Sequence, residues 1–206
     1  MRQSLARTML WPLSFLYGLV VRSRNWIFDI GIIEQKEFEL CTIVVGNLAV
    51  GGTGKTPHVI ALAKSLSKEF EVAILTRGYK RKSKGFRWVQ TDDNVNLTGD
   101  EALEMKTQLP TIHIATDGNR RRGIAKMLSE LNPTPEIIIL DDGFQHRKIK
   151  PVFSIILSKI SDLYTQDLML PAGKLREPRK GAKRAHAICI SGNQRGTSTD
   201  ELRANI

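Results

Sequence analysis

The sequence predicts an α/β fold, with a doubly wound, mostly parallel β-sheet flanked by helices. Short apolar, β-branched runs alternate along the chain with segments whose apolar residues recur at helical spacing. Several of these runs, such as residues 41–45 and 136–140, are apolar on both faces, as strands buried in a parallel sheet are. The 206 residues suffice for one such domain, or for one domain and an appendage.

The expected elements follow one another in the alternating order that this fold requires. We expect strands over residues 41–45, 72–76, 111–115, 136–140, 152–157 and 187–191, and helices over 57–70, 100–108 and 119–131. Pro57 suits the start of its helix, where a missing N–H has no consequence. Ligands of such sheets bind beyond the carboxyl ends of the strands, so the loops there are the first place to look for a site.

The composition narrows the class of partner without choosing one. Lys and Arg number 31 against 21 acidic residues, a formal charge of +10 that favours anionic partners. The basic residues are dispersed and lack an interleaved aromatic platform for bases, so we expect no nucleic acid. Cys41 and Cys189 lie in apolar runs, and we expect both to be buried and reduced. No Cys/His cluster suggests a structural metal.

Residues 9–21 form an apolar run between Arg2 and Arg7 on one side and Arg22 and Arg24 on the other. Thirteen residues are too few to cross a bilayer, which needs about 20 in a helix. The run therefore forms either an interfacial helix or a helix packed on the domain. Its aromatic residues and flanking arginines favour the membrane surface, and Pro12 and Gly18 predict an imperfect helix.

Residues 49–56 (AVGGTGKT) follow a predicted strand and precede a predicted helix, which is the setting of a phosphate-binding P-loop. Gly51, Gly52 and Gly54 allow successive backbone N–H groups to point at phosphate oxygens. Lys55 is expected to reach the β- and γ-phosphates, and Thr56 to ligate Mg²⁺. The predicted nucleotide-binding residues are Ala49, Val50, Gly51, Gly52, Thr53, Gly54, Lys55 and Thr56, so the fold is expected to be P-loop NTPase-like.

Residues 136–142 (EIIILDD) match the second half of such a site, an apolar strand that ends in a carboxylate holding Mg²⁺. Asp141 is the first choice as metal partner and Asp142 the second. The alternative is an acidic turn after a core strand. ATP and Mg²⁺ are the expected cofactors.

Further strings surround these two motifs: Gly-Asn-Leu at 46–48, Thr-Arg-Gly-Tyr at 76–79, Gly-Asp-Glu at 99–101, Asp-Asp-Gly-Phe-Gln-His at 141–146, and Leu-Pro-Ala-Gly and Leu-Arg-Glu-Pro at 170–173 and 175–178. In this order and spacing, up to about residue 190, the chain closely resembles the tetraacyldisaccharide 4'-kinases, the lipid A kinases of Gram-negative bacteria. The resemblance implies transfer of the ATP γ-phosphate to the 4'-hydroxyl of an acylated disaccharide 1-phosphate. It also implies a peripheral place on the cytoplasmic face of the inner membrane, without an obligate protein partner.

The resemblance also implies roles for single residues. Asp100 looks like the carboxylate that activates the acceptor hydroxyl, with Lys55 as the other catalytic residue, and Glu101 looks like a further metal ligand. The implied substrate contacts are Gln145, His146, Arg176 and Glu177. Plainer interpretations stand beside these: Asp100 as a helix cap, His146 as a loop histidine, Arg176 and Glu177 as a surface ion pair, and Arg120–Arg122 as a solvated helix face.

Residues 191–206 are polar and unlike the family, whose C-terminal portion is expected to be absent here, as in a truncated or frame-shifted product. The expected organisation is therefore a membrane-associating segment (1–35), a kinase core (36–190) and an atypical tail (191–206). Two other functions compete: a P-loop ATPase of the partitioning or assembly type, and an impaired kinase that only binds nucleotide. The former usually carries a lysine where this chain has Val50.

Overall fold

The computed structural model describes residues 2–192, with side chains from Arg7 onward, so the predicted tail lies almost wholly outside the described residues. The chain divides into two compact units. The sheet unit comprises Glu34–Gly46 and Gly54–Ile155, and the helix unit comprises Met1–Ile33, Asn47–Thr53 and Ile156–Ile206. Compactness thus groups the N-terminal helix with the segment after Ile156, whereas the sequence suggested a boundary near residue 35.

The sheet unit is built on a mostly parallel set of strands in the order β3-β4-β2-β5-β1-β6. In chain order these are β1 (Cys41–Gly46), β2 (Val72–Thr76), β3 (Arg87–Trp88), β4 (His113–Thr116), β5 (Ile137–Asp141) and β6 (Phe153–Lys159), of which β6 ends in the helix unit. Strand β5 pairs in parallel with both β1 and β2, β2 with β4, and only the short β3 is antiparallel to its neighbour β4. Every residue of β2 and β5 is buried, as expected of central strands covered on both faces.

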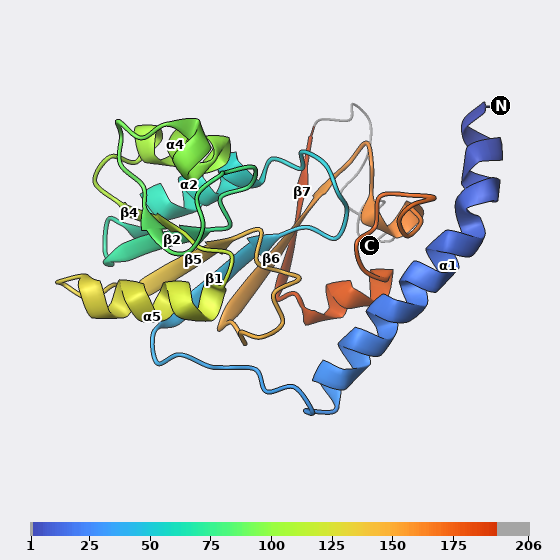
Figure 1. Ribbon diagram of the computed structural model, residues 1–206, viewed down its shortest axis with the longest axis horizontal. Coiled ribbons are helices and arrows are strands. Elements are labelled where there is room, and N and C mark those ends of the chain that lie inside the picture. Colours follow the sequence, from blue (N-terminus) through green and yellow to red (C-terminus); the bar gives the residue numbers. More distant parts are fainter. Residues whose placement is uncertain (1, 193–206) are drawn as a thin grey trace. The chain divides into compact units, whose positions relative to one another are not determined.

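Helices cover both faces of this sheet (Figure 1). Helices α2 (Lys55–Leu66) and α4 (Asp100–Gln108) lie together on one face, and α5 (Arg120–Glu130) lies on the other. The four-residue α3 (Val95–Thr98) leads directly into α4. The predicted fold class, a doubly wound and mostly parallel sheet with flanking helices, is confirmed.

The predicted elements are all present, and several of them have shifted ends. Helix α2 begins two residues before Pro57 and stops at Leu66, where Ser67 caps it, so the predicted last turn to Phe70 is wrong. Neither β3 nor α3 was predicted, because two- and four-residue elements are too short to show a periodicity.

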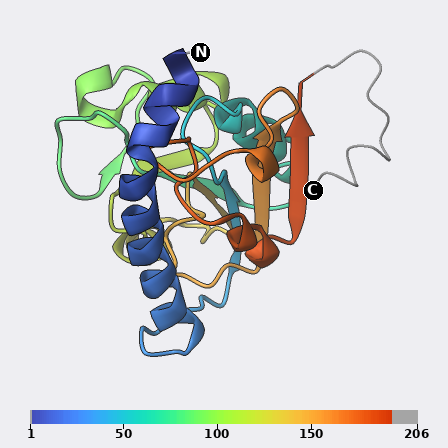
Figure 2. The same ribbon diagram turned by 90° about the vertical axis from the view of Figure 1, so that its right-hand side faces the viewer.

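The helix unit contains α1 (Arg2–Asp29), the 3₁₀ helices η1 (Tyr164–Gln166) and η2 (Arg179–Arg184), and β7 (Ala187–Ser191). Strand β7 lies beside the end of β6, where Ile160 N–H donates to the Ser191 carbonyl at 2.9 Å (Figure 2). Pro12 and Gly18 do not interrupt α1, which runs as one 28-residue helix. Because Pro12 has no N–H, one hydrogen bond is missing within this continuous helix.

Helix α1 has two different faces. Ser14, Val21, Asn25 and Phe28 recur at helical spacing and are buried, whereas the opposite surface exposes large apolar side chains. These exposed side chains are Met9, Trp11, Leu13, Phe15, Leu16, Leu19, Val20 and Trp26. None of the helices in the described part of the chain is both long and apolar enough to cross a membrane.

Neither cysteine forms a disulfide with a residue that the structure describes, and both are half-buried, whereas full burial was predicted. Cys41 opens β1 and Cys189 lies within β7, each near the margin of its unit. Partial burial raises the pKa of the Cys41 thiol, which keeps it protonated and unreactive.

Candidate active site

The loops after β1, β2, β4 and β5 leave the sheet unit at one edge, because these strands are parallel. The register places Val45 opposite Asp141, so the end of β1 adjoins the end of β5. The P-loop follows β1, and the acidic pair Asp141 and Asp142 ends β5. Parallel pairing therefore brings together two motifs that lie about 90 residues apart in the sequence.

Within the sheet unit, the P-loop residues Gly54, Lys55 and Thr56 form the start of α2. Gly54 has a φ of 80°, which favours glycine, and it precedes the first helical turn. Thr56 is buried in that turn. The first N–H groups of an α-helix lack internal partners and carry a partial positive charge, so this turn is suited to a phosphate.

The Lys55 ammonium lies 3.5 Å from Asp142 Oδ1, and both side chains are largely shielded from solvent. Asp142 adopts a φ of 47°, a left-handed conformation that aspartate tolerates better than most residues. The P-loop lysine and the second predicted metal partner are thus adjacent. An incoming anionic phosphate has to compete with this carboxylate for the ammonium group.

Asp141 is 1% exposed and only half satisfied. Its Oδ2 accepts a hydrogen bond from Thr76 Oγ1 at 3.0 Å, while its Oδ1 has no hydrogen-bond partner among the described residues. Burial raises the pKa of this carboxyl, and the neighbouring Asp142 raises it further. The Thr76 hydrogen bond and the charges of Arg120 and Lys55 act in the opposite direction without cancelling the rise.

The Gly-Asp-Glu string forms the first turn of α4. Asp100 is exposed, and its Oδ1 accepts from the Glu101 N–H at 3.0 Å, while Gly99 occupies the N-cap position. Asp100 is therefore not the cap itself. Burial raises the pKa of Glu101, and the charges of Asp141, Asp100 and Asp142 add to the rise, while Lys55 opposes it. The pKa of Glu101 therefore depends on the charges of the predicted metal ligands and catalytic residues.

The prediction that Arg120 lies on a solvated helix face is wrong. Arg120, expected on a solvated helix face, is 1% exposed, because α5 turns its first residue towards the sheet. Its guanidinium donates to the carbonyls of Asp117 at 2.6 Å and Asp141 at 2.7 Å. Burial lowers the pKa of Arg120 to about 10, so it stays charged at neutral pH. Arg120 therefore fixes the backbone that carries the Asp141 carboxylate.

The other half of the P-loop belongs to the helix unit, where Asn47 organises it. The Asn47 side chain donates to Thr53 Oγ1 at 3.0 Å and to the Gly51 carbonyl at 3.5 Å. Asn47 is fully buried, and Arg176 donates to both its side-chain and backbone oxygens. The Gly-Asn-Leu string was noted in the sequence, but its bracing of the loop could not be inferred there.

The segment that contains the Leu-Arg-Glu-Pro string pairs with residues 48–50, where the P-loop begins. Val50 N–H donates to the Lys174 carbonyl at 2.8 Å, Arg176 N–H donates to the Leu48 carbonyl at 2.8 Å, and Ala49 forms an antiparallel bridge with Leu175. Two strings separated by about 125 residues in the sequence thus form a short ladder. The Arg176 side chain points to Asn47 from this ladder.

The same strings attach α1. Tyr17 donates to the Arg176 carbonyl at 3.1 Å, and the Ala172 N–H donates to Ser14 Oγ at 2.8 Å. Glu177 is 1% exposed, and its Oε2 accepts from Asn25 at 3.1 Å and from Arg184 at 2.7 Å. The surface interpretation is therefore wrong for Glu177. Its contacts give it a structural role between α1 and η2.

Gln145 and His146 lie on the loop that follows Asp142, within the sheet unit, and both are half-buried. His146 N–H donates to the Gly143 carbonyl at 2.9 Å. Close packing holds this loop, since a Cβ added at Gly46 would lie 2.6 Å from Phe144 Cβ. The loop is thus pressed against the end of β1, and the roles of Gln145 and His146 stay predictions.

A divalent cation fits the acidic residues at the end of β5. No group of three or more His, Cys, Asp or Glu side chains is arranged to hold a metal anywhere in residues 2–192. Mg²⁺ needs no such group, because it usually takes one or two carboxylates together with waters and substrate phosphates. The buried, unpartnered Oδ1 of Asp141 is a suitable ligand atom, with Thr56, Asp142 and Glu101 nearby in the sheet unit.

Comparisons with known proteins agree with this geometry. The family model described as tetraacyldisaccharide-1-P 4'-kinase matches residues 6–205. The chain belongs to this kinase family. The match continues past residue 190, where the sequence resemblance was expected to end. The expected organisation of residues 191–206 as an atypical tail stays a prediction.

Curated relatives named tetraacyldisaccharide 4'-kinase include one from Flavobacterium johnsoniae, 44% identical over 98% of this chain, and one from Phocaeicola vulgatus, 45% identical over 94%. A crystal structure of LpxK from Aquifex aeolicus in complex with ATP superposes with a TM-score of 0.83 at 41% identity over 90% of this chain. The chain spans 59% and 53% of the two kinases and 58% of the crystallised chain.

Proposed function

We propose that this chain carries the nucleotide site of a kinase that transfers the ATP γ-phosphate to the 4'-hydroxyl of a tetraacyldisaccharide 1-phosphate in lipid A biosynthesis. The observation that carries the proposal is the Lys55–Asp142 pair at the N-terminus of α2, beside the buried Asp141. A phosphate-binding lysine next to a carboxylate pair is the arrangement that phosphoryl transfer requires. The identity of the acceptor is inferred from membership of the kinase family.

In the proposed reaction the helix N-terminus and Lys55 hold the β- and γ-phosphates of ATP. The acceptor 4'-oxygen forms a bond to the γ-phosphorus while the bond to the β,γ-bridging oxygen breaks, giving ADP and the 4'-phosphate. Lys55 neutralises charge that develops on the leaving oxygen. When the nucleotide binds, a phosphate takes the place of Asp142 as the partner of the Lys55 ammonium group.

Asp100 is proposed to accept the proton of the 4'-hydroxyl. It lies at the exposed start of α4, next to Glu101. The charges of Lys55, Asp141 and Asp142 influence the pKa of Glu101. The free carboxylate oxygen of Asp100 is accessible from solvent, as a base for an incoming acceptor has to be. The Glu101 N–H holds the other oxygen at 3.0 Å and so orients the group.

Mg²⁺ is the proposed metal, with Asp141, Asp142, Thr56 and Glu101 as the candidate ligands. These residues would hold the ion, and the ion would supply positive charge that offsets the charge of the ATP phosphates. Arg120 keeps the Asp141 backbone in place for this purpose. Gln145, His146 and Arg176 are proposed as nucleotide or substrate contacts, whereas the burial of Glu177 and its contacts with Asn25 and Arg184 favour a structural role between α1 and η2.

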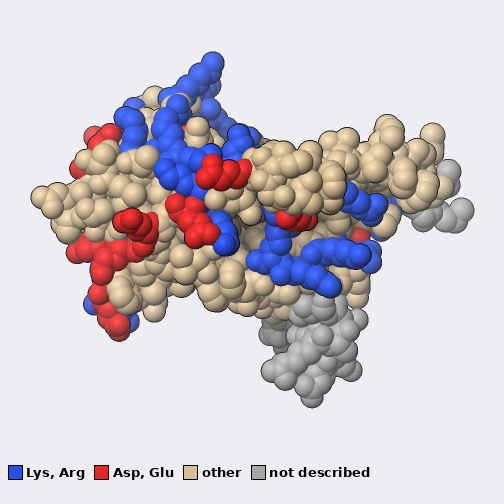
Figure 3. All heavy atoms as spheres, turned by 90° about the horizontal axis from the view of Figure 1, so that it is seen from below, with Lys and Arg blue, Asp and Glu red and all other residues tan. Residues whose placement is uncertain are grey.

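The exposed apolar face of α1 supports a peripheral location on the cytoplasmic face of the inner membrane, where a lipid acceptor is found. Burying this face in the interface removes large apolar side chains from water. On the face drawn in Figure 3, Lys and Arg side chains gather in several places, with acidic side chains among them. The formal charge of +10 adds attraction to anionic lipids without requiring nucleic acid as a partner.

The test has two measurements, because binding and transfer can be lost separately. Binding is measured by titrating the chain with a fluorescent ATP analogue in the presence of Mg²⁺. Transfer is measured as ³²P from labelled ATP appearing on an acylated glucosamine disaccharide 1-phosphate, with the Flavobacterium johnsoniae kinase as the positive control.

Lys55→Ala is expected to abolish both binding and transfer, because the γ-phosphate loses its cation. Asp100→Ala is expected to spare binding and lower transfer by 10²-fold or more, the usual range for a lost general base. Asp92→Ala removes a similarly exposed carboxylate and serves as the matched control. ATP hydrolysis without any lipid product, in a chain that binds the lipid, would refute the kinase assignment.

A further inference from the structure

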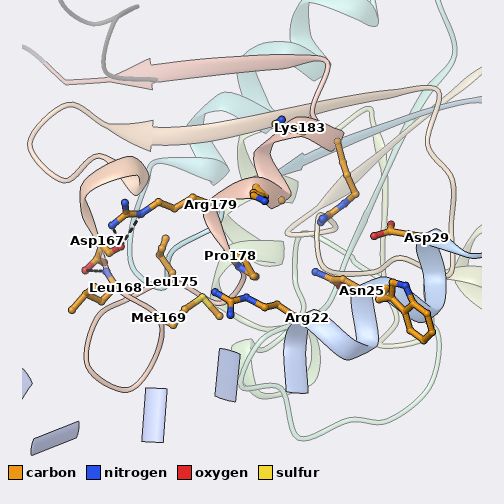
Figure 4. A pocket seen from close by; sticks show the side chains of 14 residues that line it. Arg22, Asn25, Asp29, Asp167, Leu168, Met169, Leu175, Pro178, Arg179 and Lys183 are labelled. Atoms are coloured by element: carbon orange, nitrogen blue, oxygen red, sulfur yellow. Dashed lines mark hydrogen bonds between the residues drawn. The ribbon is translucent and has the colours of Figure 1, made fainter. Parts of the chain in front are cut away.

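A cavity of about 730 Å³ lies wholly within the helix unit, and its lining includes none of the predicted nucleotide, metal, catalytic or substrate residues. The C-terminal half of α1 forms one side, and segments between Asp167 and Arg184 form the rest. Figure 4 shows Arg22 and Asn25 extending from α1 towards the segment that carries Met169 and Pro178. The size suits a small polar headgroup.

Five cations line this cavity, and two of them are already engaged. Arg184 pairs with Glu177 at 2.7 Å, and Arg179 donates to the Asp167 carbonyl at 2.8 Å. The other three, Arg22, Lys180 and Lys183, form neither a hydrogen bond nor an ion pair with any residue that the structure describes.

Acidic residues do not balance these three charges. Asp167 is 7% exposed, and its two oxygens accept from the N–H groups of Leu168 at 2.8 Å and Lys174 at 2.9 Å. Its carboxylate is therefore turned to its own loop. Asp29 is the remaining acidic residue of the lining, which leaves a net excess of two positive charges. An anion entering the cavity meets uncompensated cations in a partly enclosed space, where attraction exceeds that on an open surface.

The wall formed by α1 adds an apolar component. Trp26 lines the cavity and is 58% exposed, and Arg22 lies one helical turn before it on the same face. Exposed apolar side chains continue from there towards the N-terminus, among them Leu19 and Phe15. An exposed tryptophan beside cations, followed by apolar residues, is typical of a membrane–water interface.

We propose that this cavity binds the phosphate headgroup of an anionic membrane phospholipid. Arg22, Lys180 and Lys183 contact the phosphate oxygens, Trp26 lies at the depth of the headgroups, and the exposed apolar face of α1 contacts the acyl chains. The ligand is a lipid of the surrounding membrane and not the phosphoryl acceptor. The site therefore anchors the chain whether or not the proposed kinase reaction takes place.

The test compares vesicles of phosphatidylcholine alone with vesicles that contain 20% phosphatidylglycerol, in flotation assays with the full chain and no acceptor lipid. The variant replaces all three free cations: Arg22→Gln, Lys180→Gln and Lys183→Gln. The matched control, Lys64→Gln, Lys68→Gln and Lys148→Gln, removes three exposed lysines of the sheet unit that also lack described partners. All six side chains are exposed, so both variants are expected to fold, which circular dichroism checks.

Each basic residue near an anionic surface contributes about a fivefold change in partitioning. The cavity variant is therefore expected to lose about 100-fold in partitioning to phosphatidylglycerol vesicles, and the control less than fivefold. Equal losses in both variants, or no loss in the cavity variant, overturn the proposal, since attraction would then be a property of net charge or of another region.

A second measurement separates a lipid headgroup from free phosphate. With Trp11→Phe and Trp88→Phe, Trp26 is the single tryptophan, and its fluorescence reports on the cavity. Phosphatidylglycerol vesicles are expected to shift its emission to the blue, and this shift is expected to disappear in the cavity variant. Saturation by millimolar inorganic phosphate without any response to the vesicles overturns the proposal in favour of a soluble phosphate ligand.

Discussion

Replacing Asp141 by asparagine is expected to stabilise the nucleotide-free chain while removing its phosphoryl transfer. Asp141 is 1% exposed, and its Oδ1 has no partner in the described residues. A buried polar atom without a partner costs about 1–3 kcal/mol, a penalty that the NH₂ group of asparagine shares, whereas a buried charge costs more and is removed by the substitution. Asparagine keeps an oxygen for Thr76 but loses the attraction to Arg120 and Lys55. We therefore expect a net gain of about 1–2 kcal/mol.

For a chain of this size, about 1 kcal/mol shifts the Tm by about 2–4 °C, so Asp141→Asn should raise it by roughly 2–8 °C at neutral pH. The gain depends on pH with a definite sign. A raised pKa in the folded state means that wild-type stability is lost as pH rises from the ordinary aspartate value, about 3.9, through the folded value. Asparagine does not titrate, so the two proteins converge at acid pH, where the direction of the shift places Asp141 in its neutral form.

The assay is differential scanning fluorimetry from pH 4 to 8, without and with Mg²⁺ and ATP. Nucleotide should raise the Tm of the wild type, because a ligand at 100 times its Kd adds about 2.7 kcal/mol, and should raise that of Asp141→Asn less. Asp142→Asn is the control: it weakens a partly exposed pair with Lys55 and should lower stability by up to about 1 kcal/mol. A lower Tm for Asp141→Asn at pH 7 would refute the reasoning, since the buried charge would then be fully compensated.

Two further substitutions test residues that position the backbone around the candidate active site. Arg120→Met should cost about 3 kcal/mol in urea unfolding, because two charge-assisted hydrogen bonds to carbonyls are lost in the interior, whereas Arg121→Met should stay within about 0.5 kcal/mol. Equal effects of the two would contradict the positioning role of Arg120. Gly46→Ala should cost about 1–3 kcal/mol and weaken nucleotide binding, since its Cβ would press on Phe144, while Gly118→Ala, which meets open space, should leave binding unchanged.

The core strands and the phosphate loop follow from local sequence. β2 and β7 have the predicted ends, and α4 spans Asp100–Gln108 as predicted. Apolar runs of this kind can only be buried on both faces, and glycines beside a lysine and a threonine suit few other purposes. The spacing of apolar residues in a strand and the conformational freedom of glycines in a loop both depend on residues adjacent in the chain. The sequence alone therefore reveals them.

Arg120 shows the limit of such reasoning. In sequence it is the first of three consecutive arginines, and nothing local separates it from its neighbours. Only the packing of α5 against the sheet buries its side chain and aims it at the Asp141 carbonyl. Glu177 is similar: its burial depends on Asn25 and Arg184, which lie on separate segments.

The sequence by itself determined the alternation of strands and helices, the P-loop and the kinase family, because each depends on residues adjacent in the chain or on strings in a fixed order. The tertiary structure decided which groups meet. Parallel pairing of β1 with β5 brings Lys55 to Asp142, and the ladder of residues 48–50 with 174–176 brings Arg176 to Asn47. It also decided that three cations near α1 stay unpaired around one cavity, since pairing depends on distances that the order of residues does not fix.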